Sequence, residues 1–389
     1  MATQHPFALL DVERELNQEQ REIQSVTKQY IENRIKPNIA NWYETGEIPA
    51  RELAQELGEI GLLGMHLEGY GCAGTDATSY GLACLELEAG DSGIRSLVSV
   101  QGSLAMFAIH AYGSEEQKQE WLPKMASGDA IGCFGLTEAD FGSNPSGMLT
   151  TAKKDGGDWI INGSKMWITN GSVADVAVIW TQSDEGIRGF VIPTNTPGFS
   201  ANTVKHKLSL RASVTSELVF TDMRVPDSAR LPKVSSLRAP LMCLAEARYG
   251  IIFGAVGAAR DSFEVALNYA STRLQFDGPI SRHQLTQEKL ARMATKLNTS
   301  MLLALHLGKI KDEHKIEPAQ TSMGKFNNVS TALEITREAR SILGAAGITT
   351  EYSVFRHMNN LESVLTYEGT HEIHALTIGQ ALTGIAAFR

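Results

Sequence analysis

The spacing of the apolar residues changes twice along this chain of 389 residues, and that change constrains the fold more than any single motif. From about residue 17 to 131, apolar side chains recur at helical spacing, interrupted by glycine-rich breaks. Between residues 133 and 232, short runs rich in β-branched and aromatic residues lie between turn residues, which is typical of strands. After residue 235 the helical spacing returns. We therefore expect a mainly α protein with a central β-domain.

These changes also predict where the domains begin and end. We expect an N-terminal helical domain over residues 1–132, a small and mostly antiparallel β-domain over 133–234, and a C-terminal helical bundle over 235–389. Long apolar stripes in the last part predict helices that pack as a bundle, with outer faces that could also contact other subunits. The predicted helices of the bundle are residues 241–271, 284–311, 319–343 and a terminal helix from His371.

Composition excludes several classes of protein. A formal net charge of -9 and a pI near 5.6 leave no basic field that would attract nucleic acid or anionic lipid. No stretch is apolar enough without interruption to predict membrane insertion, and the start of the chain lacks the pattern of a signal or transit peptide, so we expect a cytoplasmic protein. The cysteines show no metal-ligand spacing and are expected to be reduced and buried. They are Cys72, Cys84, Cys133 and Cys243.

Two weak motifs predict no site of their own. Residues 69–74 match the dinucleotide fingerprint G-x-G-x-x-G, but they follow a helical pattern and not a strand. His371 and His374 flank Glu372, yet their separation differs from the i, i+4 spacing of a zinc helix. We expect no metal site.

The best candidate for a catalytic base is Glu368, which stands between Tyr367 and Gly369 where an apolar stretch gives way to the start of a helix. Gly369 lets another molecule approach the backbone closely, and Thr370 can cap the following helix. The alternative is an ordinary loop-to-helix junction with a solvated glutamate, since acidic residues are common at helix N-termini. Motifs elsewhere in the chain favour the catalytic interpretation.

Three segments have the side chains to hold an aromatic dinucleotide. Residues 134–143 alternate apolar positions with hydroxyls and glycines that can lie along a flat ring. Trp167 can cover a ring face, and the Thr169 hydroxyl can donate to a ring nitrogen. Residues 273–276 end a predicted helix with a guanidinium, an amide and an aromatic ring suited to a diphosphate and an adenine. The alternatives are packed strand ends and a helix C-terminus whose arginine complements the dipole.

In combination these motifs resemble those of the acyl-CoA dehydrogenase family, over nearly the whole chain. Among its branches the chain is most similar to glutaryl-CoA dehydrogenase. The resemblance implies the fold of that family: an N-terminal helical domain, a β-barrel-like middle domain and a C-terminal four-helix bundle. The family motifs lie at residues 134–138, 167–170, 273–276 and 366–370, and those of the branch at 91–96, 210–213, 247–250 and 382–388.

The resemblance implies FAD as the cofactor, bound mainly between the β-domain and the C-terminal bundle. A neighbouring subunit would supply part of the contact, because members of the family are usually homotetramers. Carried over residue by residue, the implied cofactor contacts are Phe134, Leu136, Thr137, Gly142, Ser143, Trp167, Ile168, Thr169, Arg273, Gln275, Phe276, Gln284, Leu343, Gly344, Thr370 and Phe388.

The substrate specificity implied by the resemblance centres on Arg95. In glutaryl-CoA dehydrogenases the matching arginine meets the distal carboxylate of the substrate, and the residue matching Glu88 tempers it. An alternative is a salt-bridge ladder, since Glu88, Asp91 and Arg95 recur at i, i+3 and i+7 on one predicted helical face. The implied substrate-binding residues are Glu88, Arg95, Ser96, Ser143, Leu241, Arg248 and Gly369.

The implied reaction is α,β-dehydrogenation of glutaryl-CoA, with Glu368 as the α-proton base and flavin N5 as the hydride acceptor. Decarboxylation to crotonyl-CoA could follow, with electrons passing to electron-transfer flavoprotein. Desolvation would raise the pKa of Glu368 toward the range that a base needs. Some branches place the base just before the residue equivalent to Arg248; that position is Ala247 here, and neighbouring Glu246 is the natural control.

Four departures from the family pattern leave the acyl group and the electron acceptor open. One alternative keeps the scaffold but passes electrons to O2, which would make the chain a flavin-dependent oxidase or monooxygenase acting on a CoA thioester. Another is a catalytically silent scaffold that binds FAD or CoA. The departures are Ala139, Asn144, Asp277 and Ala345, all within the implied flavin site.

Overall fold

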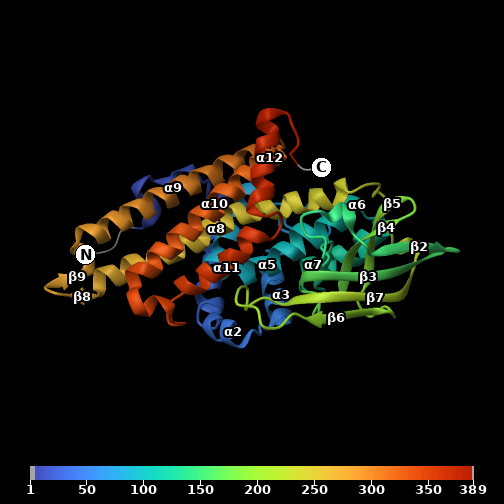
Figure 1. Cartoon of the computed structure of the whole chain (residues 1–389), viewed down its shortest axis with the longest axis horizontal. Coiled ribbons are helices and arrows are strands. Elements are labelled where there is room, and N and C mark those ends of the chain that lie inside the picture. The colour runs from blue at the N-terminus through green and yellow to red at the C-terminus, as the bar shows by residue number, and fades with distance from the viewer. Residues whose placement is uncertain (1–4, 388–389) are drawn as a thin grey trace.

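Long helices occupy one part of the molecule and a curled β-sheet occupies the other, as the computed structural model of residues 5–387 shows (Figure 1). The order of elements along the chain is helical, then β, then helical, so the predicted fold class is confirmed. The boundaries at residues 132/133 and 234/235 stay predictions, because the two helical parts share one hydrophobic core.

The first helical part is built on capped helices. Asn17 and Gln20 form a capping box at the start of α1, and Asp76 caps α4 by accepting a hydrogen bond from Ser79 N at 2.6 Å. The elements are η1 (Pro6–Leu9), η2 (Val12–Glu15), α1 (Gln18–Tyr30), η3 (Ile31–Ile35), α2 (Ile39–Thr45), α3 (Ala50–Glu59), α4 (Ala77–Gly90), α5 (Ser92–Ser99), η4 (Val100–Met106), α6 (Phe107–Tyr112) and α7 (Glu115–Ala126).

The sheet has the strand order β1-β4-β2-β3-β7-β6, with β5 paired to β4. Its ladders are antiparallel except for β1–β4 and β2–β4, which are parallel, so the expectation of a mostly antiparallel domain is confirmed. Its strands are β1 (Gly132–Gly135), β2 (Thr151–Asp155), β3 (Asp158–Thr169), β4 (Val176–Ser183), β5 (Gly186–Pro193), β6 (Phe199–Thr203) and β7 (Thr215–Pro226), followed by the short η6 (Asp227–Ala229); η5 (Pro145–Gly147) precedes β2.

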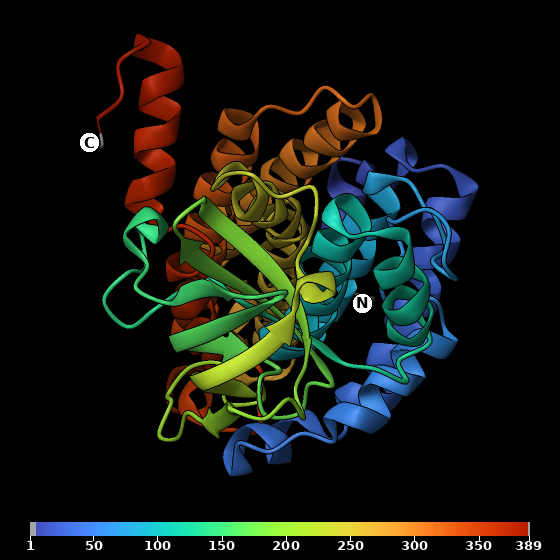
Figure 2. The ribbon, with the colours of Figure 1, turned by 90° about the vertical axis from the view of Figure 1, so that its right-hand side faces the viewer.

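The C-terminal part confirms the predicted long helices to within three residues at their ends. Sequence reasoning did not separate the helix that precedes Glu368, which is α11. The elements are α8 (Arg238–Thr272), β8 (Leu274–Gln275), β9 (Gly278–Pro279), η7 (Ile280–Arg282), α9 (Gln284–Asp312), α10 (Pro318–Leu343), η8 (Gly344–Ile348), α11 (Val354–Thr366) and α12 (His371–Thr383). Both views show α12 projecting from the rest of the bundle (Figures 1 and 2).

Helix α8 forms the centre of the helical core, between α4 and α10. It approaches α4 so closely that a Cβ at Gly257 would lie 1.9 Å from the carbonyl oxygen of Leu85, so only glycine fits there. By length and composition alone α8 could cross a membrane, which the sequence reasoning did not expect of any segment. Since 67% of its most apolar stretch is buried inside the protein, we interpret it as a core helix.

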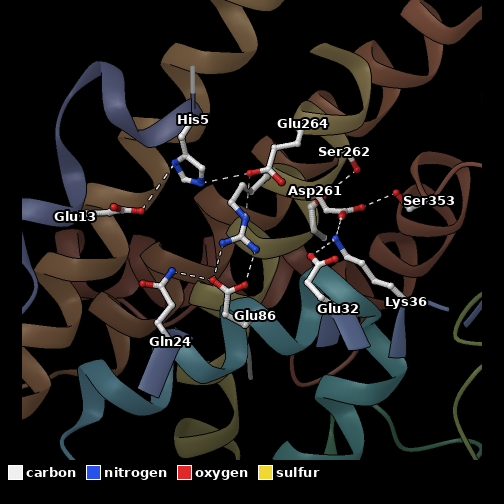
Figure 3. Close-up of polar contacts among 12 residues, drawn as sticks. His5, Glu13, Gln24, Glu32, Lys36, Glu86, Asp261, Ser262, Glu264 and Ser353 are labelled. Carbon is white, nitrogen blue, oxygen red and sulfur yellow. Dashed lines mark hydrogen bonds and ion pairs between the residues drawn. The ribbon is translucent and has the colours of Figure 1, made fainter. Parts of the chain in front are cut away.

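Buried ion pairs also tie the first helices to α8, and Figure 3 shows them. Both guanidinium nitrogens of the Arg260 fork donate to Glu86 of α4 at 2.6 Å, and Gln24 of α1 donates to the same carboxylate at 2.8 Å. Beside them, Lys36 Nζ lies 2.8 Å from Asp261 Oδ1. Ser353 donates to the other Asp261 oxygen, so each of these carboxylates is held by charged and neutral donors together.

The cysteines and the glycine-rich loop agree with the sequence reasoning. All four cysteines are free; Cys84, Cys133 and Cys243 are buried and Cys72 is half-buried. Burial raises the pKa of the Cys84 and Cys133 thiols to about 12, so both stay protonated at neutral pH. Residues 69–74 lie in the loop between α3 and α4, with no strand before them in the described chain, so they cannot be a Rossmann turn.

Candidate active site

Glu368 lies in the short loop between α11 and α12, with its backbone in the left-handed region at φ 53°. Gly369 continues that turn at φ 96°, and Thr370 caps α12 by accepting a hydrogen bond from Ile373 N at 3.3 Å. The predicted cap and the glycine are thus confirmed. A glutamate with positive φ is strained, and such strain is characteristic of functional sites.

One oxygen of the Glu368 carboxylate is buried and lacks a hydrogen-bond donor in the described chain. Its Oε2 is closed off from solvent and has no partner among the described residues. Desolvation raises the pKa of Glu368 above its ordinary value of 4.5, although the charges of Arg95, Lys325 and Arg248 work against the rise. A carboxylate of raised pKa with a free oxygen is equipped to accept a proton from a bound molecule.

The backbone of this loop is held by two cations from other helices. Arg248 of α8 donates from Nε to the Glu368 carbonyl oxygen at 2.7 Å. Lys325 of α10 donates from Nζ to the Gly369 carbonyl oxygen at 2.7 Å and also to that of Tyr367. Sequence reasoning named Arg248 but missed Lys325. The only sequence signal was a lysine between Gly324 and Phe326 in a predicted helix, and it did not point to the carbonyls that Lys325 binds.

Arg95 and Glu88 form a buried ion pair beside this loop. Arg95 Nε donates to Glu88 Oε2 at 2.7 Å, Arg95 Nη2 donates to the Tyr367 hydroxyl, and the guanidinium lies over the Tyr367 ring with 5.6 Å between its carbon and the centroid. Ser92 donates to the second Glu88 oxygen at 2.8 Å. The pair is closed to solvent, with 1% of the Arg95 side chain exposed.

The expectation that Glu88, Asp91 and Arg95 share one continuous helical face is wrong. The chain breaks at Asp91, whose extended backbone ends α4 and whose side chain caps α5 by accepting from Gly93 N at 2.7 Å. Asp91 is paired with Arg356 of α11 at 2.5 Å and takes no part in the Arg95 pair. The Glu88–Arg95 ion pair of the salt-bridge alternative is therefore present, but the ladder through Asp91 is not, and the Arg95 guanidinium also contacts Tyr367.

Several polar atoms of Arg95, of α5 and beside Gly369 are buried without any described partner. They are Arg95 Nη1, the hydroxyls of Ser96 and Ser99, and Nε2 of His374. Buried donors normally have hydrogen-bond partners, and a buried donor left without one costs free energy. A cluster of unsatisfied donors next to a candidate base indicates a place for a ligand that carries acceptors. Ser96 was predicted; Ser99 was missed, although it repeats Ser96 at i+3 on α5.

The two flavin motifs of the β-domain lie side by side. Met166 N donates to the Thr137 carbonyl oxygen at 2.8 Å, which links the segment after β1 to the end of β3. A bulge in β3 gives Trp167 a φ of 65°, and its side chain is 57% exposed. A bulge re-aims a side chain out of the ladder, and here it presents an indole face to the surface. Thr169 follows at the end of the strand.

A buried ion pair holds these two segments together. Lys165 Nζ donates to Glu138 Oε1 at 2.8 Å and to the Leu136 carbonyl oxygen at 3.1 Å, while Thr150 donates to the same carboxylate. The pair connects the segment that carries Leu136 and Thr137 with the strand that carries Trp167. Phe134 and Leu136 are buried in the core, whereas Gly142 and Ser143 are exposed in the loop that follows.

The remaining predicted cofactor residues lie at the opposite end of the helical bundle, where Figure 1 shows the β8–β9 hairpin. Arg273 follows Arg248 by 25 residues along and just past α8, roughly 37 Å at the rise of an α-helix. Lys289 Nζ donates to Ser341 Oγ at 2.9 Å, which joins the start of α9 to the end of α10 at this same end. The group comprises Arg273, Gln275, Phe276, Gln284, Leu343 and Gly344.

One chain therefore does not bring all the predicted cofactor residues together. The first group, from Phe134 to Thr169, adjoins the β-domain, and the second is exposed at the far end, where the Phe276 side chain is 93% exposed. Arg248 contacts Glu368, and Leu241 lies exposed about two turns earlier on α8. Phe388 lies outside the described residues. The departures Ala139, Asn144, Asp277 and Ala345 are all exposed, so their side chains disturb no packing.

Comparisons with known proteins agree over the whole length. Family models of the acyl-CoA dehydrogenase N-terminal, middle and C-terminal domains match residues 17–129, 133–223 and 237–383. The human mitochondrial short-chain specific acyl-CoA dehydrogenase is 35% identical over 358 residues, which cover 90% of this chain and 87% of that protein. A crystal structure of glutaryl-CoA dehydrogenase from Mycobacterium smegmatis is 66% identical with a TM-score of 0.98, and both chains are fully covered. A second such structure, in complex with FADH2, is 63% identical with the same TM-score and coverage.

Proposed function

The chain belongs to the acyl-CoA dehydrogenase family, and from that premise we propose that its substrate is glutaryl-CoA. It is an FAD-dependent oxidoreductase that acts on the CH–CH group of acyl-CoA thioesters. The observation that carries the substrate proposal is the buried Arg95, which keeps Nη1 free of any partner in the described chain although Glu88 neutralises the guanidinium. A second carboxylate, at the distal end of a dicarboxyl acyl group, would satisfy that donor.

The residues present fit FAD. Trp167 offers an exposed indole face, and the Thr169 hydroxyl makes no hydrogen bond to any residue between 5 and 387, so it is free to donate. Open space surrounds the position of a Cβ at Gly142. At the far end Arg273 is exposed and without an ion pair in the described chain, as a diphosphate contact requires. When bound, FAD supplies the acceptor for the hydride that leaves the substrate β-carbon.

In this function Glu368 takes the α-proton. Its Oε2 is enclosed and unpartnered, and desolvation raises its pKa, so transfer from a carbon acid costs less than it would to an ordinary carboxylate. The negative charge that develops on the thioester oxygen needs donors, and the Glu368 backbone N–H, unbonded within the described residues, is available. Arg95 holds the far end of the acyl chain, which orients the α-carbon toward Glu368.

The electron acceptor and product follow from the same proposal. We expect electrons to pass to electron-transfer flavoprotein and the oxidised acyl group to lose CO2, which gives crotonyl-CoA. The alternative acceptor is O2, which would make the protein an oxidase or monooxygenase on the same scaffold. A silent scaffold is disfavoured, because an unpartnered base and unpartnered buried donors are costly to keep without a ligand.

The separation of the two groups of cofactor residues supports assembly from several copies. Trp167 lies near the end of β3 in the β-domain, whereas Arg273 lies just past the end of α8, next to the β8–β9 hairpin that Figure 1 shows at the far end of the bundle, so we infer that a second copy brings its own far end to the β-domain of the first. We propose a homotetramer, as is usual in the family, in the cytoplasm. Sedimentation of the FAD-loaded protein tests the assembly, and a monomer that retains FAD would contradict it.

One anaerobic titration tests the substrate proposal. The bound flavin is titrated with glutaryl-CoA and with butyryl-CoA, which lacks the distal carboxylate, in the wild type and in Arg95→Met. Glutaryl-CoA should bleach the wild-type flavin, and the Arg95→Met variant should lose about 10²-fold or more in affinity for glutaryl-CoA while butyryl-CoA is affected little. Admission of oxygen then distinguishes a dehydrogenase, which reoxidises slowly, from an oxidase. An unchanged flavin spectrum with glutaryl-CoA would refute the assignment.

A further inference from the structure

Lys325 contacts the catalytic loop in a way that the reaction does not by itself explain. The side chain is buried on α10, with 1% of the residue exposed, and its ammonium donates to the carbonyl oxygens of Gly369 and Tyr367. The carbonyl between them belongs to Glu368 and accepts from Arg248 Nε at 2.7 Å. Three consecutive carbonyl groups are therefore held by two cations that come from two other helices.

The backbone at this point needs such support. Glu368 has φ 53° and Gly369 has φ 96°, and the left-handed region is strained for a residue that carries a Cβ. Conformations of this kind persist only where surrounding contacts determine them. Hydrogen bonds from a charged donor are about twice as strong as neutral ones, so the ammonium is well suited to hold the two carbonyls on either side of Glu368.

A neutral donor could hold the same carbonyls at a lower desolvation cost. Burial lowers the pKa of Lys325 from its ordinary value of 10.5 to about 7, and the charge of Glu368 is the main influence in the other direction. Burying a charged ammonium costs more free energy than burying a neutral donor that could bind the same carbonyls, which indicates that the charge of Lys325 has a role of its own. Its charge therefore has a second effect, which is to lower the pKa of Glu368.

Among the groups near Glu368, the positive charges that lower its pKa come from Lys325 and two arginines. Arg248 from α8 and Arg95 from α5 face the same place, and Glu88 of α4 neutralises Arg95. His374 of α12 adds no charge, because burial lowers its pKa to about 3. The phenol of Tyr367 is likewise neutral, since burial raises its pKa. Of the three cations, Lys325 is the one whose proton can leave near neutral pH.

We propose that Lys325 is a positioning residue for the base: its ammonium fixes the left-handed backbone of Glu368 through the carbonyls on both sides, and its charge favours the ionised form of the Glu368 carboxylate. This inference rests on the proposed function of Glu368 as the α-proton base. It separates two effects of one side chain, a hydrogen-bonding effect on the loop and an electrostatic effect on the carboxylate.

Two variants of the FAD-loaded protein separate those effects. Lys325→Met removes both the donor and the charge, whereas Lys325→Gln keeps a donor and removes the charge. Lys207→Met is the matched control, because Lys207 is also a largely buried lysine that donates to loop carbonyls, those of Leu210 and Ser213, both at 2.8 Å. Leu210 likewise has a positive φ of 49°, so the control loses a lysine clamp on a strained loop elsewhere.

Two measurements are made on each variant. Hydrogen–deuterium exchange of the peptide spanning residues 366–371 reports the loop, and the pH dependence of flavin bleaching by glutaryl-CoA reports the ionisation of Glu368. We expect Lys325→Met to exchange about tenfold faster and to move the acid midpoint up by about one pH unit or more. Lys325→Gln should recover part of the protection and keep the shift. Lys207→Met should change neither quantity.

The proposal is overturned if the midpoint of both Lys325 variants equals that of the wild type, or if the exchange of the loop is unchanged in Lys325→Met. It is also overturned if neither variant folds, since Lys325 would then act in folding. If Lys325→Met alone fails to fold, the midpoint of Lys325→Gln decides. Wild-type protein that no acyl-CoA bleaches would refute the proposed function instead; the exchange of the loop, and the pH dependence of thermal stability, would still test Lys325.

Discussion

Two buried glutamates of this protein, Glu86 and Glu368, differ in what surrounds their oxygens. Glu86 accepts from Arg260 at 2.6 Å on both oxygens and from Gln24 at 2.8 Å, in the network that Figure 3 shows. Although burial alone would raise it, the charge and hydrogen bonds of Arg260 hold the pKa of Glu86 below its ordinary value. At Glu368 burial prevails and raises the pKa, because Oε2 accepts nothing from the described chain.

The difference separates a structural charge from a functional one. A buried carboxylate with all its partners costs little to keep ionised, and such a pair can specify how two helices pack. A buried carboxylate that lacks partners costs free energy until a ligand or a proton arrives. Burial and charge are therefore not enough to recognise a catalytic residue in this fold; of the two carboxylates, only that of Glu368 has a buried oxygen without a partner in the described chain, whereas an unpartnered nitrogen occurs at both Arg95 and Arg260.

The largest effect should come from removing the ionisable group at Glu368. We expect Glu368→Gln to bleach with acyl-CoA about 10²–10⁴-fold more slowly than the wild type, because the amide cannot accept the α-proton. The measurement is anaerobic stopped-flow absorbance of the bound flavin. Glu246→Gln is the control, since Glu246 lies nearby on α8 but both its oxygens are bound by Lys311 at 2.8 and 2.9 Å. If both variants slowed bleaching equally, the assignment of Glu368 as the base would be wrong.

A smaller effect, on stability and not on rate, is expected at the structural pair. Glu86→Ala leaves the Arg260 guanidinium buried and without its carboxylate, which should lower the free energy of unfolding by about 3–5 kcal/mol. Denaturant unfolding measures this loss. Replacing both partners, as Glu86→Leu with Arg260→Met, should recover most of it. The rate of flavin bleaching per folded molecule should stay at the wild-type value; a rate that fell as in Glu368→Gln would abolish the distinction between the two glutamates.

The smallest effect concerns pH and has opposite signs at the two sites. Because burial raises the pKa of Glu368, its contribution to stability is fully present below its ordinary pKa of 4.5 and is lost as the pH rises through the raised value. Glu368→Gln should therefore melt like the wild type near pH 4.5 and up to about 2 °C higher at neutral pH. At Glu86 the pKa is lowered, so its contribution is present above 4.5 and lost as the pH falls.

Thermal melts of the FAD-free protein across this pH range make the comparison. Glu246→Gln, which loses an ion pair with Lys311, should show no gain in melting temperature at neutral pH. A melting temperature of Glu368→Gln that stayed below that of the wild type at every pH would mean that Glu368 has partners that the structure does not describe.

Much of the site could be predicted from local sequence. The glycine after Glu368 and the capping threonine have a conformational reason that acts within a few residues, and both are confirmed at Gly369 and Thr370. The surroundings of Arg95 could not be predicted in this way. A single extended residue, Asp91, ends one helix and caps the next, and that break turned a predicted helical face into a buried pair with Glu88.

Lys325 shows why the rest was out of reach. Its partners, the carbonyls of Tyr367 and Gly369, lie more than forty residues along the chain, and nothing near Lys325 in the sequence identifies them. The same is true of the far group around Arg273, whose separation from Arg248 follows from the length of α8. Hydrophobic periodicity predicts that a helix forms, but not which elements pack against each of its ends.

The sequence by itself determined the order of helical, β and helical parts and the ends of the long helices, because periodicity, caps and turn residues act locally. The family followed from the resemblance of its motifs. The tertiary structure decided which charges are completed by partners and which are left open. Desolvation depends on everything that surrounds a group, and the elements around Glu368 come from α5, α8, α10 and α12 together. For that reason the identity of the base could be inferred from its motif, but its raised pKa and its dependence on Lys325 could not.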